Sequence, residues 1–286
     1  MMQRTQYSYQ TTLFYFASVI LSVLFSWFAW RQYAVINPDG ICYVLSAEQF
    51  ASHGLKAVMQ TCGQANWPFY SVLLALTTAL SGLSLETSAF LLNTLFDAMA
   101  VLFFVLIVQR LNASPRIIFL GLLTILCAHD FNSVRDNIVR DHGYWMCYLA
   151  SLYCLLRYVE RPTFFWAGAF GISTIIATLF RIEGLVFFVL LPLSVLACQG
   201  KLRERLQRMA MLYVPHVLIA FSLICLLFFF KNGLQEYSGR LPDALSKISH
   251  SAILILTQFQ SAKMNLLQYL MPRLGSGNIG SEPMRT

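Results

Sequence analysis

Long runs of apolar residues recur along most of this chain. The first, Leu13 to Trp30, has no charged residue over eighteen positions, and a helix of that length nearly crosses a hydrocarbon core of about 30 Å. No small-residue cleavage site follows it and further apolar runs come later, so a spanning helix is favoured over a removable signal peptide. Six more runs predict spanning helices: Thr87–Gln109, Ile117–His129, Tyr144–Leu156, Phe164–Phe180, Leu185–Cys198 and Met209–Phe230.

These runs predict an all-α fold, a polytopic membrane helical bundle with about seven transmembrane helices, because helices satisfy their own backbone polar groups in lipid. A further apolar stretch, Pro68–Gly82, is too short to cross upright. We expect it to lie in or dip into the outer leaflet, within one long outside loop over residues 31–86 that carries interfacial helices.

The distribution of Lys and Arg supports this topology. With seven spans and the N-terminus inside, the cytoplasmic segments hold nine basic residues and two acidic ones, whereas the outside loops before the tail hold five basic and seven acidic. If Pro68–Gly82 crossed the bilayer, RLNASPR and KLRERLQR would face outward, against this rule. The cytoplasmic set is Arg4, Arg110, Arg116, Arg157, Arg161, Lys201, Arg203, Arg205 and Arg208 with Glu160 and Glu204. The outside set is Arg31, Lys56, Arg135, Arg140 and Arg181 with Asp39, Glu48, Glu86, Asp130, Asp136, Asp141 and Glu183.

Composition agrees with an integral membrane protein: 57% of the residues are hydrophobic, 12% are charged, and the mean hydropathy is +0.62. Topology and anionic lipid headgroups explain much of the net charge of +7, and no motif predicts a nucleic-acid partner. The seven cysteines lack metal-ligand spacing. Cys42 and Cys62 share the first outside loop, where an oxidising compartment would permit a disulfide; free thiols are the alternative.

Ionisable residues at the membrane boundary are costly and tend to be functional, and here they gather on the predicted outside face. Asp39 lies in N-P-D-G, a turn signature, before an expected helix over Cys42–His53. The plain alternative for Asp39 is a turn former or a helix N-cap.

The second outside segment, HDFNSVRDNIVRDHGYW, is dense in charge. Its arginines suit an anion and its carboxylates could orient a nucleophile or a cation; the alternative is a solvated loop with internal salt bridges. The residues concerned are Arg135, Asp136, Arg140, Asp141 and His142.

Arg181 and Glu183 in FRIEG mark the next outside boundary, where an arginine could bind a lipid phosphate or simply snorkel to the headgroups. Asp97 lies within the second span, and we expect it to be neutral, hydrogen-bonded and structural rather than catalytic. The histidines share no ligand spacing, so no zinc site is predicted.

Taken together, these motifs resemble the glycosyltransferase C superfamily, in particular the protein O-mannosyltransferases and the aminoarabinose transferase of lipid A. NPDGICY resembles the first acidic motif, with Asp39 in the acidic position and Tyr43 after it, and NWPFYSVLLALTTALSG resembles the helix that closes the first loop without crossing. VRDNIVRDHGYW lies where the second acidic motif belongs, and LFRIEG resembles the boundary that binds lipid phosphate in relatives. The resemblance covers about residues 10 to 230.

The resemblance implies an enzyme that moves a sugar from a polyprenyl-phosphate donor to a glycan, lipid or protein acceptor on the outer, periplasmic or luminal, face. We expect a multi-pass protein of a bacterial inner membrane. Asp39 is the candidate general base, with Asp141 or Asp136 orienting the acceptor or a cation; no cofactor is certain, and a divalent cation stays open. Arg140, Arg181 and Arg135 are candidates for binding the donor phosphate, and Tyr43, His142 and Glu183 are further site candidates.

Two other functions compete with this prediction. A transporter or lipid flippase would use Asp97 and the outside charges along a translocation path. A non-catalytic membrane subunit, a degenerate relative of the transferases, is the other alternative. We expect two regions: a membrane module over residues 1–230 and an outside or interfacial tail over residues 231–286, with an apolar helical segment from Ala252 to Leu270.

Overall fold

The computed structural model describes residues 2–32, 35–63 and 67–229, and every regular element within this part is a helix. The all-α prediction is therefore confirmed for the described residues. The chain divides into two compact units, Met1–Ile219 and Ala220–Thr286. Of the second unit, only the end of helix α11 (Leu202–Phe229) is described. The predicted tail over residues 231–286, with its apolar segment, lies outside the described residues.

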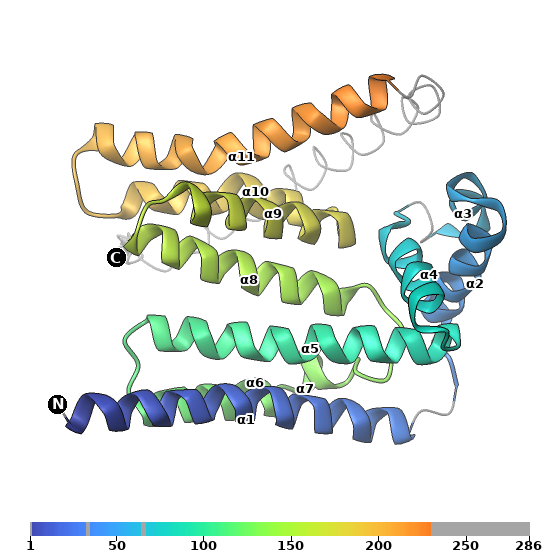
Figure 1. The fold of residues 1–286 in the computed structure, drawn as a ribbon, viewed down its shortest axis with the longest axis horizontal. Helices are drawn as coiled ribbons and strands as arrows, with labels where there is room; N and C mark the ends of the chain where they lie inside the picture. Colours follow the sequence, from blue (N-terminus) through green and yellow to red (C-terminus); the bar gives the residue numbers. More distant parts are fainter. Residues whose placement is uncertain (1, 33–34, 64–66, 230–286) are drawn as a thin grey trace, which may run out of the picture. The chain divides into compact units, whose positions relative to one another are not determined.

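The first unit is built around long helices that pack side by side. Helix α5 (Leu85–Arg110) lies between α1 (Met2–Gln32) and α8 (Asp141–Glu160), and α8 packs in turn against α9 (Phe164–Phe180) (Figure 1). Two segments are long and apolar enough to cross a membrane, Thr12–Gln32 and Leu85–Arg110. Four shorter apolar helices accompany them: Phe69–Ser81, Pro115–Cys127, Phe164–Phe180 and Gly184–Ala197.

Within the described residues, each predicted spanning run coincides with helical residues, but two of these runs are divided, one of them at a proline. Pro115 opens α6 (Pro115–Cys127), where its missing N–H costs nothing, and Ala128 separates α6 from the single turn α7 (His129–Asn132). Helix α10 (Gly184–Leu190) gives way to a 3₁₀ helix (Leu191–Ala197) at Pro192, which removes a backbone donor. The predicted runs at 117–129 and 185–198 are therefore each two elements rather than one.

The predicted first outside loop folds into three helices at one end of the long helices: α2 (Pro38–His53), α3 (Leu55–Thr61) and α4 (Phe69–Ser81) (Figure 1). The apolar stretch 68–82 is helical, as predicted, and has only 13 helical residues. Helix α4 packs against α2 and α5. It ends at Gly82, whose left-handed φ of 69° suits a residue without a side chain.

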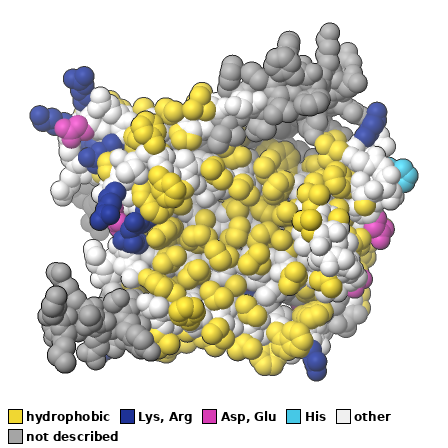
Figure 2. Space-filling model, in the orientation of Figure 1, with side chains coloured by type: hydrophobic (Ala, Val, Ile, Leu, Met, Phe, Trp, Pro, Cys, Tyr) yellow, Lys and Arg dark blue, Asp and Glu magenta, His cyan; other side chains and the backbone are white. Residues whose placement is uncertain are grey.

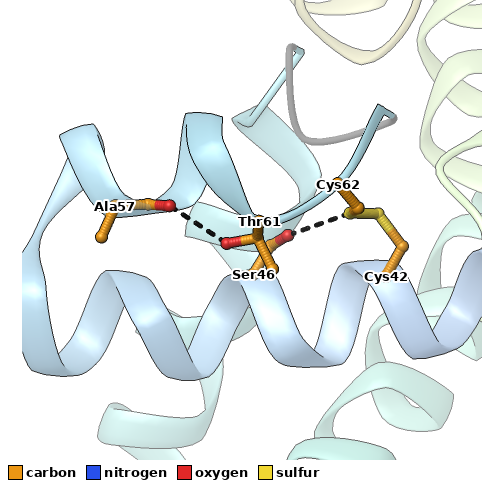
Figure 3. Close-up of a disulfide and its surroundings, with 5 residues drawn as sticks. All are labelled: Cys42, Ser46, Ala57, Thr61 and Cys62. Carbon is orange, nitrogen blue, oxygen red and sulfur yellow. Dashed lines mark hydrogen bonds between the residues drawn. A yellow bond between two sulfur atoms is a disulfide. The ribbon is translucent and has the colours of Figure 1, made fainter.

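A disulfide joins Cys42 of α2 to Cys62 after α3, which answers the question that the sequence left open (Figure 3). The two Cα atoms are 6.1 Å apart, within the usual range for a disulfide. Beside it, the Thr61 hydroxyl donates to the Ala57 carbonyl over 3.0 Å, and Ser46 contacts the Cys62 sulfur. The bond fixes the helical hairpin of α2 and α3, and with it the segment that carries Asp39.

A single apolar core fastens the three-helix loop to the bundle. Tyr43 and Tyr70 from the loop helices pack with Phe96 of α5, Cys147 of α8 and Phe180 of α9, and each of them is buried. The rings of Tyr43 and Tyr70 meet edge to face at 5.1 Å, a favoured aromatic geometry. This core holds the starts of α2 and α8 and the end of α9 close together.

Apolar side chains also cover much of the outer surface. Figure 2 shows them across the middle of the visible face, with Lys and Arg side chains gathered at the left edge, at the end opposite to α2, α3 and α4. Exposed large apolar residues come from α1, α5, α6 and α9, for example Phe16, Leu95, Leu120 and Ile172. A surface of this kind is unusual for a monomer in water and suits contact with lipid.

Candidate functional site

Three segments that are far apart in the sequence meet at the end of the bundle near α2: the start of α2, the start of α8 and the end of α9 (Figure 1). The first two are joined directly, because the Asn37 side-chain oxygen accepts a hydrogen bond of 2.8 Å from the backbone N–H of Ile138. A Cβ on Gly40 would lie 3.0 Å from the Cβ of Ile138. Asp39 is therefore held beside the segment that carries Arg140.

The start of α8 and the end of α9 meet through Gly143 and Phe180. A side chain at position 143 would overlap the Phe180 ring, so only glycine permits this approach. Arg181, the next residue, donates a hydrogen bond to the carboxylate of Asp141. Its guanidinium also lies 5.8 Å from the centre of the Tyr144 ring.

Tyr43 lies where the charges of all three segments act. Burial raises the pKa of its hydroxyl; Arg140 and Arg181 lower this pKa, and Asp39 and Asp141 raise it. Charged groups of all three segments therefore act on this hydroxyl. We call Asp39, Tyr43, Arg140, Asp141 and Arg181 the three-segment cluster.

Glu183 orients Arg181 within this cluster. Two N–H groups of the guanidinium face the two carboxylate oxygens, over 3.1 Å and 3.4 Å. Partial burial opposes ionisation of Glu183, but the hydrogen bonds and charge of Arg181 outweigh it, and with Arg140 they lower the pKa of this carboxyl. The Glu183 bonds in turn raise the pKa of Arg181, which stays a cation. This fork geometry fixes the plane of the guanidinium.

Asp39 is exposed in the first turn of α2. The predicted helix start at Cys42 was wrong by four residues, because Pro38 takes the first helical position with Asn37 as the N-cap. Asp39 is therefore not the N-cap itself. Its carboxylate lies in the first turn of the helix, near the positive end of the α2 dipole.

Three predicted site residues lie apart from the cluster. The Arg135 and His142 side chains are at most 2% exposed and point to Asp97, not to the surface. Sequence patterns grouped them with Asp141 because they are close in the chain. Asp136 is half-buried in the turn before α8, and within the described part of the chain no ion pair connects it to the cluster.

Asp97 lies between two basic side chains. One carboxylate oxygen is 2.8 Å from Nδ1 of His142 and the other is 3.5 Å from an Nη atom of Arg135. Its predicted neutral state stays a prediction. Its predicted structural role agrees with its burial, at 1% exposed.

Sequence reasoning missed Asn37, Gly143 and Tyr144 as parts of this region. A signal for Gly143 was present in the sequence: each charged motif contains a glycine within three residues of its key charge, as in Asp39–Gly40, Asp141–Gly143 and Arg181–Gly184. At Gly184 an added Cβ would lie 2.7 Å from the backbone nitrogen of Thr178. Glycines that permit close packing mark the points where the three segments meet.

A groove lies between α2 and α4, with a volume of about 450 Å³. Its lining includes Ala47, Glu48, Ala51, Ala75 and Ala79, but no member of the three-segment cluster. In residues 2–32, 35–63 and 67–229, no group of three His, Cys, Asp or Glu side chains could hold a metal ion. A divalent cation at the cluster stays a prediction.

Comparison with protein-family models, with curated proteins and with solved structures gave no match to this chain. The functional argument therefore depends on the residues and their geometry.

Proposed function

We propose that this protein is a membrane glycosyltransferase that moves a sugar from a polyprenyl-phosphate donor to an acceptor on the outer face of a membrane. The observation that carries the proposal is the meeting of three charged segments at one end of the bundle, beside an apolar surface: the start of α2 is bound to Ile138 through Asn37, and Arg181 at the end of α9 is bound to Asp141 at the start of α8. A donor with a lipid tail needs this combination, because its tail stays in hydrocarbon while its phosphate meets polar groups.

The proposal includes seven membrane passes, made by α1, α5, α6, α8, α9, α10 with its 3₁₀ extension, and α11. Successive long helices connect at alternate ends of the first unit, and α2, α3 and α4 stay at one end (Figure 1). The disulfide supports an oxidising compartment at the α2 end, and the Lys and Arg side chains that Figure 2 shows at the opposite end suit a cytoplasmic face. The cluster would then face the periplasm or lumen.

In the proposed reaction, a hydroxyl or amine of the acceptor attacks the anomeric carbon of the donor sugar. Asp39 takes the proton of the nucleophile as general base, while the bond between the sugar and the phosphate oxygen breaks. The electron pair leaves with the polyprenyl phosphate. The exposed position of Asp39 gives an acceptor direct access to this carboxylate.

Arg140 and Arg181 would stabilise the charge that develops on the leaving phosphate. Arg181 uses three of the five N–H groups of a guanidinium in its bonds to Asp141 and Glu183. We assign the other two to phosphate oxygens. Asp141 would orient Arg181 and the acceptor, and Tyr43 would contact the sugar or the phosphate.

The test is transfer by the purified full chain, with labelled polyprenyl-phosphate sugar as donor and release of the carrier as readout. Asp39→Asn should lower transfer by about 100-fold or more, as expected for the loss of one general base, while expression and membrane insertion stay normal. Glu48→Gln is the matched control, because Glu48 is an exposed acid on the same helix. Transfer by Asp39→Asn at the wild-type rate would remove the catalytic assignment.

A transporter or flippase is the weaker alternative, because Asp97, the residue that it would use in the membrane, does not line a translocation path. Asp97 is 1% exposed and its carboxylate is bound to His142 and Arg135. Proteoliposome transport without carrier release would favour this alternative over transfer.

A further inference from the structure

Behind the three-segment cluster lies a second group of charges that the proposed reaction does not use. Asp97 of α5, Arg135 of the turn before α8 and His142 of α8 are each at most 2% exposed, and we call them the buried triad. Three ionisable groups at such depth carry a large desolvation cost unless they are paired, so we asked which contacts compensate this cost.

Arg135 ties the triad to the first helix. It donates to the Ser22 carbonyl over 3.1 Å, to the Ser26 hydroxyl over 2.7 Å and to the Ser22 hydroxyl over 3.2 Å. A further bond of 2.7 Å runs to the Asn132 side-chain oxygen. The residue is thus held by α1, by its own turn and by Asp97, which leaves it no access to a substrate phosphate.

The hydrogen bonds of His142 define its charge. Nδ1 lies 2.8 Å from the Asp97 carboxylate and Nε2 lies 3.2 Å from the carbonyl oxygen of Asn137. A carboxylate and a carbonyl can only accept, so both ring nitrogens must donate, which only the imidazolium form can do. Arg135 lies beside the other carboxylate oxygen, at 3.5 Å. Asp97 therefore lies between two buried basic side chains.

The hydrogen bonds of the buried triad also fix the turn before α8, which leads into the three-segment cluster. The Asn137 carbonyl accepts from His142 and also from the Asn93 side chain over 3.2 Å, and Asn93 in turn accepts from the Tyr70 hydroxyl over 2.9 Å. The next residue, Ile138, donates its N–H to Asn37. The segment from Arg135 to His142 is fixed at both ends and at its centre, and it contains Arg140 and Asp141.

We infer that Asp97 is a positioning residue for transfer: through His142 and Arg135 it sets the turn that places Arg140 and Asp141 beside Asp39 and Arg181. This inference rests on the proposed function for its kinetic part. Asp97 touches no substrate, so its loss should act on the rate of the chemical step more than on donor binding.

The kinetic test compares Asp97→Asn with Asp130→Asn in the purified full chain. Asp97→Asn should lower kcat on the order of 10 to 100-fold with a small change in donor KM, because a displacement of about 1 Å in positioned groups can cost about 100-fold. Asp130→Asn is the matched control, since the Asp130 side chain is fully exposed near the same turn. Wild-type kcat in Asp97→Asn would overturn the inference.

A spectroscopic test needs no activity. In protein with isotope-labelled histidine, His142 should give the nitrogen signals of a doubly protonated ring at neutral pH, assigned by their loss in His142→Gln. A neutral tautomer in the wild type overturns the inference, whether or not the protein transfers sugar. If the wild type transfers no sugar but His142 is doubly protonated, the proposed function is wrong, whereas the charge arrangement inferred for the buried triad is confirmed. If Asp97→Asn does not fold, His142→Gln takes its place, with the same expected fall in kcat and the same overturning result.

Discussion

Individual charges in this protein take their roles from depth rather than from residue type. Asp39 is exposed at a helix start, where a substrate can reach it, whereas Asp97 is buried between two cations. Arg181 is partly exposed and shares two carboxylates, whereas Arg135 is fully engaged inside the bundle. An aspartate and an arginine, Asp39 and Arg181, are therefore accessible to a substrate in the proposed reaction. A second aspartate and arginine, Asp97 and Arg135, are buried and hold the fold in place.

The Arg181–Glu183 pair predicts a specific dependence on pH. The pKa of Glu183 is lowered in the folded protein, so its stabilisation is present above the ordinary value of 4.5 and disappears as the pH falls through the folded value. The difference in free energy of unfolding between the wild type and Glu183→Gln should be below about 1 kcal/mol, as for other partly exposed pairs. It should be constant from neutral pH to about 4.5 and vanish at lower pH, as measured by thermal unfolding. A difference that grows on acidification would contradict this pairing.

At this scale the sequence predicted some residues better than others. Asp39, Asp141 and Arg181 were predicted because charges beside apolar runs are rare; the structure joins Asp141 to Arg181 and places the start of α2 beside the turn before α8. Arg135 and His142 were placed in the same site because nothing in the local sequence separates a buried polar side chain from an exposed one. Their partners, Asp97, Ser22 and Ser26, come from distant helices, and only the fold shows them.

At the scale of elements, glycines decide where the helices approach each other. Gly143 lets the start of α8 pack on the Phe180 ring, and this contact brings Asp141 to Arg181. Gly40 does the same between α2 and Ile138. Both glycines lie in the first turn of their helix, where the missing side chain permits this close packing.

Gly143→Ala should therefore destabilise the protein by about 1–3 kcal/mol, as other overpacked substitutions do, and should slow transfer through displacement of Asp141. Gly168→Ala is the control, because an added Cβ there meets nothing within 4 Å. It should leave stability unchanged or raise it slightly. Thermal unfolding of both variants in detergent measures the two stabilities. Equal stability of Gly143→Ala and Gly168→Ala would show that the close contact of position 143 with Phe180 does not affect stability.

Helices were more predictable than their ends. Apolar runs of sufficient length located all the long helices, since burial in lipid or in a core requires them. The start of α2 and the breaks after Cys127 and at Pro192 depend on single prolines and caps, whose effect the hydropathy pattern does not record. The packing of α4 against α2 and α5 likewise follows from tertiary contacts between residues that are distant in sequence.

At the scale of the whole molecule, three observations on the first unit point the same way. Its flanks are apolar, most of the Lys and Arg side chains visible in Figure 2 lie at one end, and a disulfide closes the hairpin at the other end. Together they favour a bundle that crosses a membrane with the three-segment cluster on the oxidising side. The proposed reaction depends on this arrangement, because a site divided between two faces could not hold one donor.

The most direct test of this account is the sidedness of single cysteines in intact cells, in a background in which the free cysteines are replaced by serine. Cysteines at the exposed positions Ser52 and Ser133, at the α2 end, should react with an impermeant thiol reagent. Cysteines at Leu111 and Arg161, exposed at the opposite end, should react only after the membrane is opened. If Leu111→Cys reacts with the reagent outside an intact cell, the end of the bundle opposite to α2 is not cytoplasmic. This result would contradict the proposed site.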